Sequence, residues 1–120
     1  MIITLEYGGK NLKFSFGLGF LGELLEVTGL DIDAVVLKLK QNPFRMIPLM
    51  MYYSTFWAYR LEDKELDFTL VEFINWVDKD GGVSTDKTQK FLDSFTESLN
   101  KDVPKEKPTA RKKGTSSPKK

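Results

Sequence analysis

The chain has 120 residues, a length that allows one domain with a core of its own. It contains neither cysteine nor histidine, which excludes disulfides, thiolate zinc sites, thiol nucleophiles and the usual general base near neutral pH, and favours an intracellular compartment. The net charge of +1 hides a division, because residues 1–100 carry ten basic and fifteen acidic side chains, whereas residues 101–120 carry eight and two. We place a domain boundary near residue 100.

Two short runs of alternating apolar and polar residues flank Gly8-Gly9 near the start of the chain. The apolar positions are Ile3, Leu5, Tyr7, Leu12, Phe14 and Phe16. Two such runs around a pair of glycines, which tolerate positive φ, predict a β-hairpin. Because an isolated hairpin is marginally stable in water, we expect its apolar face to pack on the helices that follow.

Residues 17–22 read GLGFLG and match the glycine pattern of a dinucleotide-binding loop. The context argues against nucleotide binding. The helix that follows ends at Gly29, too early to return the chain to a parallel strand, and residues 40–42, where an acidic ribose ligand is expected, read KQN. We interpret the glycines as permitting close packing between the hairpin and the next helix.

Two helices are predicted next. The first starts near Leu18 and stops at Gly29, a residue suited to the left-handed conformation that ends a helix. One side of it holds Leu18, Leu21, Leu25 and Thr28, and the adjoining positions are Phe20, Leu24 and Val27, which leaves Glu23 and Glu26 for the remaining surface. Asp31 can cap a second helix over residues 32–41, although residues 34–40 (AVVLKLK) also admit a strand.

Residues 44–59 form the segment around which we expect the domain to be organised. Twelve of these sixteen residues are apolar or aromatic, and a helical wheel gives them no polar side. Such a helix must be covered by neighbouring elements, by a partner chain or by lipid. Lipid is the weakest option, because the run is shorter than the ~20 residues of a spanning helix and is interrupted by Arg45, Pro48, Ser54 and Thr55.

Two more helices are predicted in the second half of residues 1–100. Thr69 and Glu72 fit a capping box at the head of a helix over residues 70–78. Ser84 or Thr85 can cap a last helix that ends near residue 100.

Residues 78–82 (DKDGG), between these two helices, resemble the start of a calcium-binding loop. The register contradicts that interpretation, because Val83 falls on the obligatory glycine and Gln89 on the bidentate glutamate. We therefore expect a glycine turn between helices.

These elements predict an α+β, mainly α fold, in which an N-terminal β-hairpin packs on a bundle of about five helices over residues 1–100. Residues 101–120 interleave proline with lysine, arginine, serine and threonine. This composition cannot form a core and predicts a disordered basic C-terminal tail.

The helices carry more large apolar side chains than a domain of this size hides easily. This excess indicates a surface that binds another protein or further copies of the chain, as in a homo-oligomer. Methionine and aromatic side chains suit adaptable binding surfaces. The candidate partner-binding residues are Met50, Tyr53, Phe56, Trp57, Phe73 and Trp76. The alternative, that each of them is a core residue, stays open at this point.

No enzymatic activity, metal or cofactor is expected. Without histidine or cysteine, acid–base catalysis would need paired carboxylates, and the acidic residues here are scattered over predicted polar faces.

Residues 14–26, FSFGLGFLGELLE, resemble the opening of the tail assembly chaperones of long-tailed (siphovirus-type) bacteriophages. The F-L-x-E-L core of that family is matched by Phe20, Leu21, Glu23 and Leu24. An N-P pair before an apolar helix, a T-x-x-E-F segment and a final amphipathic helix are also similar, and they extend the resemblance over residues 1–100. The sequence departs from the family at Gly22, where a charged residue is common.

The resemblance implies a small helical protein that acts in the host cytoplasm during infection. Its expected partners are the phage tape-measure protein, which it binds and keeps soluble, and the tail-tube protein, whose subunits it helps to recruit during virion assembly. Many members of the family also exist in a longer form, made by a programmed ribosomal frameshift near the end of the gene.

The basic tail supports one alternative function, that of a small nucleic-acid-associated or regulatory protein. Lysine and arginine side chains would bind phosphates without sequence preference. However, the body is acidic and the tail contains no aromatic residue on which a base could stack. We therefore do not expect nucleic acid to be the main partner.

Overall fold

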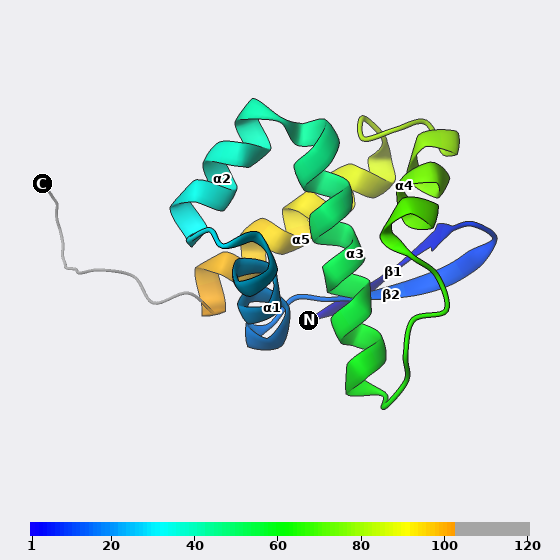
Figure 1. Cartoon of the computed structure of the whole chain (residues 1–120), viewed down its shortest axis with the longest axis horizontal. Helices are drawn as coiled ribbons and strands as arrows, with labels where there is room; N and C mark the ends of the chain where they lie inside the picture. Colours follow the sequence, from blue (N-terminus) through cyan, green and yellow to red (C-terminus); the bar gives the residue numbers. More distant parts are fainter. Residues whose placement is uncertain (103–120) are drawn as a thin grey trace, which may run out of the picture.

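The computed structural model describes residues 1–102, and their side chains as far as residue 100. Two strands and five helices occupy this part of the chain (Figure 1). They are β1 (Ile2–Tyr7), β2 (Lys10–Ser15), α1 (Leu18–Thr28), α2 (Ile32–Gln41), α3 (Pro43–Leu61), α4 (Leu70–Lys79) and α5 (Asp86–Asp102). The predicted class, a hairpin with a mainly helical body, is confirmed. The predicted disordered tail lies outside the described residues, except that residues 101 and 102 continue α5.

β1 and β2 form an antiparallel hairpin in which Leu5 lies opposite Leu12. Gly8 and Gly9 make its two-residue turn with φ angles of 61° and 76°, the left-handed conformations that a type I′ turn requires. Side chains on one face of the hairpin are largely buried and those on the other face are mostly exposed. The hairpin therefore covers the core with one side and meets solvent with the other.

The central segment becomes α3, which crosses the front of the molecule with α1 on one side and α4 on the other (Figure 1). It contacts β2, α1, α2 and α4. Pro43 lies in its first turn. Backbone N–H groups there have no partner within the helix, so the N–H that proline lacks costs no hydrogen bond. The inward side of α3 buries Ile47, Met50, Met51, Ser54 and Ala58.

Aromatic rings from distant parts of the chain meet in the core. The centroid of the Phe14 ring in β2 lies 5.8 Å from that of the Phe91 ring in α5 and 6.5 Å from that of the Phe73 ring in α4. Phe20 of α1 lies 6.0 Å from Phe95 of α5. Aromatic pairs of this kind add roughly 0.5–1.5 kcal/mol each beyond the burial of their area. The core thus joins the hairpin and α1 directly to the last helix.

Two buried serines bind the backbone at the end of β2, where the chain leaves the hairpin. The Ser54 hydroxyl of α3 donates to the backbone oxygen of Ser15 at 2.9 Å, and the Ser98 hydroxyl of α5 donates to that of Phe16 at 3.0 Å. A buried carbonyl oxygen without a partner would cost about 1–3 kcal/mol. These two bonds therefore fix the exit of the hairpin between α3 and α5.

The beginnings of α2 and α4 follow local signals in the sequence. The Asp31 carboxylate accepts a hydrogen bond from the backbone N–H of Ala34 at 2.8 Å and caps α2. Thr69 and Glu72 form the predicted capping box at the head of α4. Residues 34–40 are accordingly helical, and the alternative of a strand is not adopted.

The glycine pair after α4 ends that helix in a Schellman motif. Gly81 adopts a φ of 108°, and the N–H of Gly82 donates to the backbone oxygen of Val77 at 2.9 Å. The Thr85 hydroxyl oxygen then caps α5 by accepting a hydrogen bond from the backbone N–H of Thr88 at 3.2 Å. The glycine turn between helices is therefore confirmed.

The glycines of residues 17–22 have a different role from the predicted one. A Cβ atom at Gly19 would overlap the indole of Trp57 in α3, whereas a Cβ at Gly17 or Gly22 would meet nothing within 4 Å. The prediction that these glycines bring the hairpin and the helix together is wrong. Gly19 instead allows α1 to approach α3, because a side chain there would occupy the space of the indole.

The packing face of α1 is shifted within the predicted apolar surface, away from Leu18 and toward the adjoining positions. Its buried residues are Phe20, Leu21 and Leu24, whereas Leu18 is 73% exposed. At about 100° per residue, Leu18 lies roughly 120° from the centre of the buried face. The prediction is therefore wrong for Leu18 and right for Leu21, and the adjoining residues Phe20 and Leu24 form the centre of the face rather than its border.

Candidate protein-binding surface

Two of the six predicted partner-binding residues lie in the core. Met50 and Phe73 are both 0% exposed. Met50 is on the inward side of α3, and the ring of Phe73 lies 5.4 Å from that of Tyr7. Neither side chain presents surface to a partner, so both are removed from the candidate surface.

Trp57 and Trp76 are half-buried because each covers a glycine of a neighbouring element. The indole of Trp57 packs on Gly19, and that of Trp76 packs on Gly8 in the hairpin turn. Trp76 also lies 4.9 Å from the ring of Phe68, measured between centroids. These two tryptophans lie at the margin of the core and pack against it.

Tyr53 and Phe56 belong to an outward-facing row on α3, which we call the α3 ridge. The ridge consists of Arg45, Leu49, Tyr53, Phe56 and Arg60, which follow one another at intervals of three or four residues and so share one face of the helix. The rings of Tyr53 and Phe56 are 6.0 Å apart, and the guanidinium carbon of Arg60 lies 6.0 Å from the centre of the Phe56 ring. The two arginines are exposed, and the three residues between them are half-buried.

A groove of about 600 Å³ opens beside the first half of the ridge, where α1 ends and α2 joins α3. It is lined by Val27, Thr28, Leu30, Lys38, Gln41, Asn42, Arg45, Met46 and Leu49. Arg45 and Leu49 belong to both features, so the groove and the ridge form one continuous surface. The groove lining contains two cations, Lys38 and Arg45, and no carboxylate.

Sequence reasoning finds part of the ridge and misses the groove. The groove is formed by residues 27–30, 38–42 and 45–49, which come together only in the folded chain. No local pattern in the sequence predicts that they do. The ridge does leave a signal, an apolar row with an arginine at each end. On a helix that is apolar all round, however, nothing in the sequence marks this row as the one that faces outward.

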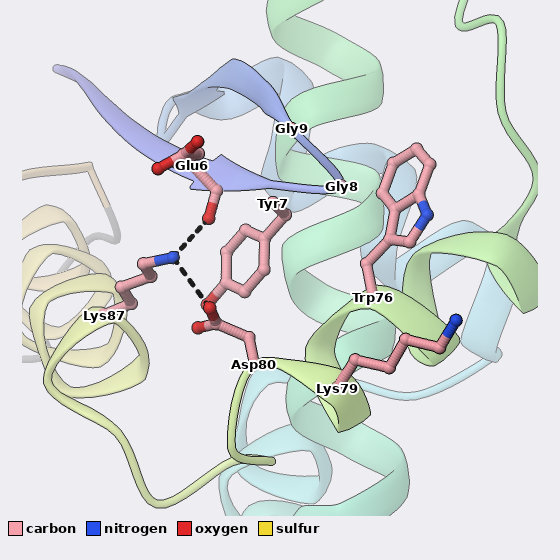
Figure 2. A pocket seen from close by; sticks show the side chains of 8 residues that line it. All are labelled: Glu6, Tyr7, Gly8, Gly9, Trp76, Lys79, Asp80 and Lys87. Carbon is pink, nitrogen blue, oxygen red and sulfur yellow. Dashed lines mark hydrogen bonds and ion pairs between the residues drawn. The ribbon is translucent and has the colours of Figure 1, made fainter.

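A smaller pocket of about 280 Å³ lies between the hairpin turn, the end of α4 and the start of α5 (Figure 2). Lys87 of α5 donates to the backbone oxygen of Glu6 and forms an ion pair with Asp80 at 3.0 Å. Its ammonium group also lies 4.8 Å from the centre of the Tyr7 ring. Since these contacts fasten α5 to the hairpin and to the end of α4, we interpret the pocket as a structural junction.

Tyr7 carries an unusual polar group in this junction. The side chain is 2% exposed, and its hydroxyl has no partner with hydrogen-bond geometry. Burial raises the pKa of Tyr7, the nearby Thr88 hydroxyl lowers it, and the charge of Asp80 raises it, with an upward shift as the result. A buried hydroxyl that has lost its water without gaining a partner costs about 1–3 kcal/mol.

Replacing Tyr7 by phenylalanine should therefore raise the free energy of unfolding by about 1 kcal/mol, since the ring contacts remain and the desolvated hydroxyl is gone. Urea denaturation at neutral pH measures the change. The raised pKa adds a second effect: above the ordinary tyrosine pKa of 10.0 the unfolded chain releases this proton first, so wild-type stability falls as the pH rises and the variant loses less. A variant that is less stable than wild type at neutral pH would show that the hydroxyl is bonded.

Compared with protein-family models, curated proteins and solved structures, the chain has no match. Over residues 1–102, no helix is long and apolar enough to cross a membrane. In the same range, no three potential ligands among histidine, cysteine, aspartate and glutamate gather as they would around a metal ion. The continuous surface of ridge and groove is the candidate binding site.

Proposed function

We propose that this protein is an assembly chaperone that binds a helical segment of another protein and keeps that protein soluble. One observation carries the proposal: on the outer side of α3, the half-buried side chains of Leu49, Tyr53 and Phe56 adjoin an open groove and form one continuous, partly exposed apolar surface with it. Apolar grooves beside a helix are a common receptor for amphipathic helices. Phe56 supports this role, because it is half-buried yet lies outside the core cluster of the described residues.

The resemblance of residues 14–26 to tail assembly chaperones directs the proposal to a particular client. We expect the client to be the tape-measure protein of a long-tailed bacteriophage, with tail-tube subunits as the next component to be recruited and the host cytoplasm as the site of action. A long helical protein with apolar stripes aggregates when these stripes are uncovered, and a chaperone with an apolar groove would cover them. No step of this function requires a catalytic residue or a cofactor.

Co-expression tests the proposal directly. A tape-measure protein from the same genome should be insoluble alone and soluble together with the wild-type chain. The Phe56→Gln variant should reduce the soluble fraction several-fold, whereas Val71→Gln should not, although Val71 is an apolar residue on α4 that is 76% exposed. A client that stays insoluble with the wild type, or that both variants rescue equally, would contradict the proposal.

The same complex separates the proposal from the nucleic-acid alternative. Apolar contacts should hold the complex together when the salt concentration is raised. Binding to nucleic acid would weaken by several orders of magnitude between roughly 50 and 200 mM salt, because counterion release drives it.

A further inference from the structure

The charges on the binding surface point to a specific kind of partner segment. We infer that the α3 ridge and its groove bind an amphipathic helix that carries acidic side chains at both ends of its apolar stripe. The inference rests on the proposed function, since it names the chemistry of the client at the same surface.

The ridge and groove carry positive charge on a body that is negative. Residues 1–100 have ten basic and fifteen acidic side chains, a net charge of −5. Within this range, the ion pairs of the structure use Lys10, Lys13, Lys64 and Lys87. Arg45 and Arg60, at the two ends of the ridge, and Lys38 in the groove have no carboxylate within ion-pair distance in the described residues. They are available to a partner's carboxylates.

The spacing of the ridge sets the length of the partner segment. From Arg45 to Arg60 the helix advances by about 22 Å, which corresponds to roughly four turns and about 15 residues of a partner helix. Between the arginines, Leu49, Tyr53 and Phe56 repeat at i, i+4 and i+7, the spacing of an apolar stripe in a helix that packs alongside. A partner therefore needs a matching stripe and a carboxylate beyond each end of it.

The same charges disfavour the two other occupants that are at hand. If a second copy of the chain docked ridge to ridge, Arg45 would meet Arg60 in the antiparallel orientation and Arg45 in the parallel one, so cations would oppose each other either way. Residues 103–120 of the chain carry seven basic side chains and one acidic side chain, so they would be repelled as well. Self-association of the protein, which the sequence predicts, would have to use another surface.

Two synthetic helical peptides of about 15 residues test the inference. Both carry leucines at the spacing of one helical stripe, and they differ only at their ends, where one has glutamates and the other lysines. Fluorescence anisotropy with the full-length chain should show that the glutamate peptide binds about tenfold more tightly, and that high salt narrows the difference. The double variant R45E/R60E should reverse the preference. Arg45→Glu alone should reduce the preference for the glutamate peptide. This variant should stay folded, because negative charge is favoured at the start of a helix.

A matched control removes two cations elsewhere. The variant K79E/K90E changes the net charge by the same amount at exposed lysines of α4 and α5 outside the ridge and groove, and it should keep the wild-type preference. Circular dichroism confirms that each variant is folded. Equal affinity for the two peptides, or a preference that R45E/R60E leaves unchanged, would overturn the inference. So would wild-type chains that dimerise and are made monomeric by Phe56→Gln.

Failure of this inference can be distinguished from failure of the proposed function. Suppose that the wild type and R45E/R60E solubilise the client equally, while Phe56→Gln fails to do so. In that case the chaperone function stands and the charge recognition is wrong. If neither peptide binds and the client stays insoluble, both fail.

Discussion

Replacing Phe14 by alanine is expected to lower the free energy of unfolding by about 4 kcal/mol, the typical cost of truncating a fully buried phenylalanine. Phe14 is 0% exposed, and its ring lies 5.8 Å from that of Phe91, 6.4 Å from that of Tyr7 and 6.5 Å from that of Phe73. The change removes apolar burial and also leaves a cavity between the hairpin, α4 and α5. Since small domains have a total stability of roughly 5–15 kcal/mol, the variant should be close to unfolding at physiological temperature. Urea denaturation followed by tryptophan fluorescence measures it.

Phe56→Ala is the matched control for this prediction. Phe56 has the same side chain, but it lies on the outer face of α3 and contacts Tyr53 and Arg60 of the same helix. Its truncation should cost less than about 1 kcal/mol, as at other sites outside the core. Similar losses in the two variants would mean that the ridge is part of the core and would remove the basis for a binding surface on α3.

Gly19→Ala should destabilise the protein by about 2 kcal/mol, because the new methyl group would occupy the space of the Trp57 indole. The rigid ring must move as a whole, which separates α1 from α3. This cost exceeds the gain of up to about 1 kcal/mol that alanine brings over glycine inside a helix. Thermal denaturation of the variant and the wild type gives the difference.

Gly22→Ala, in the same helix, should have the opposite sign. A Cβ at Gly22 would meet nothing within 4 Å, so the variant should gain up to about 1 kcal/mol from helix propensity alone. The double variant Gly19→Ala/Trp57→Leu should recover part of the loss, since the smaller side chain leaves room for the methyl group. If Gly19→Ala were as stable as Gly22→Ala, the contact between α1 and α3 would not be close.

The elements of this fold could be predicted from the sequence because their signals are local. The turn at Gly8-Gly9, the cap at Asp31 and the capping box of Thr69 and Glu72 each depend on a few adjacent residues. Such signals state where a helix or a strand begins, whatever surrounds it. The glycine turn before α5 was also predictable, because the residues that a calcium loop requires are not at the required positions and the glycine pair is itself a local turn signal.

The side chains that face outward could not be predicted, because exposure is decided by which elements pack together. Met50 and Phe56 lie six residues apart on one helix that is apolar on every side, and only the positions of β2 and the other helices make the first a core residue and the second a surface residue. Gly19 and Gly22 are likewise equivalent in the sequence. The indole of Trp57, placed by the packing of α3 on α1, distinguishes them. The groove has no local signal at all.

The bond from Ser98 to Phe16, together with the rings of Phe91 and Phe95 in the core, determines when this chain can finish folding. Its two ends are separated by 82 residues, and α5 is the last element of the described chain. At a translation rate of about 5–20 residues per second, the end of the hairpin is synthesised roughly 4–16 s before its final neighbour in α5. During that interval Phe14, Phe16 and Phe20 lack the helix that covers them in the finished fold. A protein proposed to shield the apolar stripes of a client therefore needs protection of its own while it is being made.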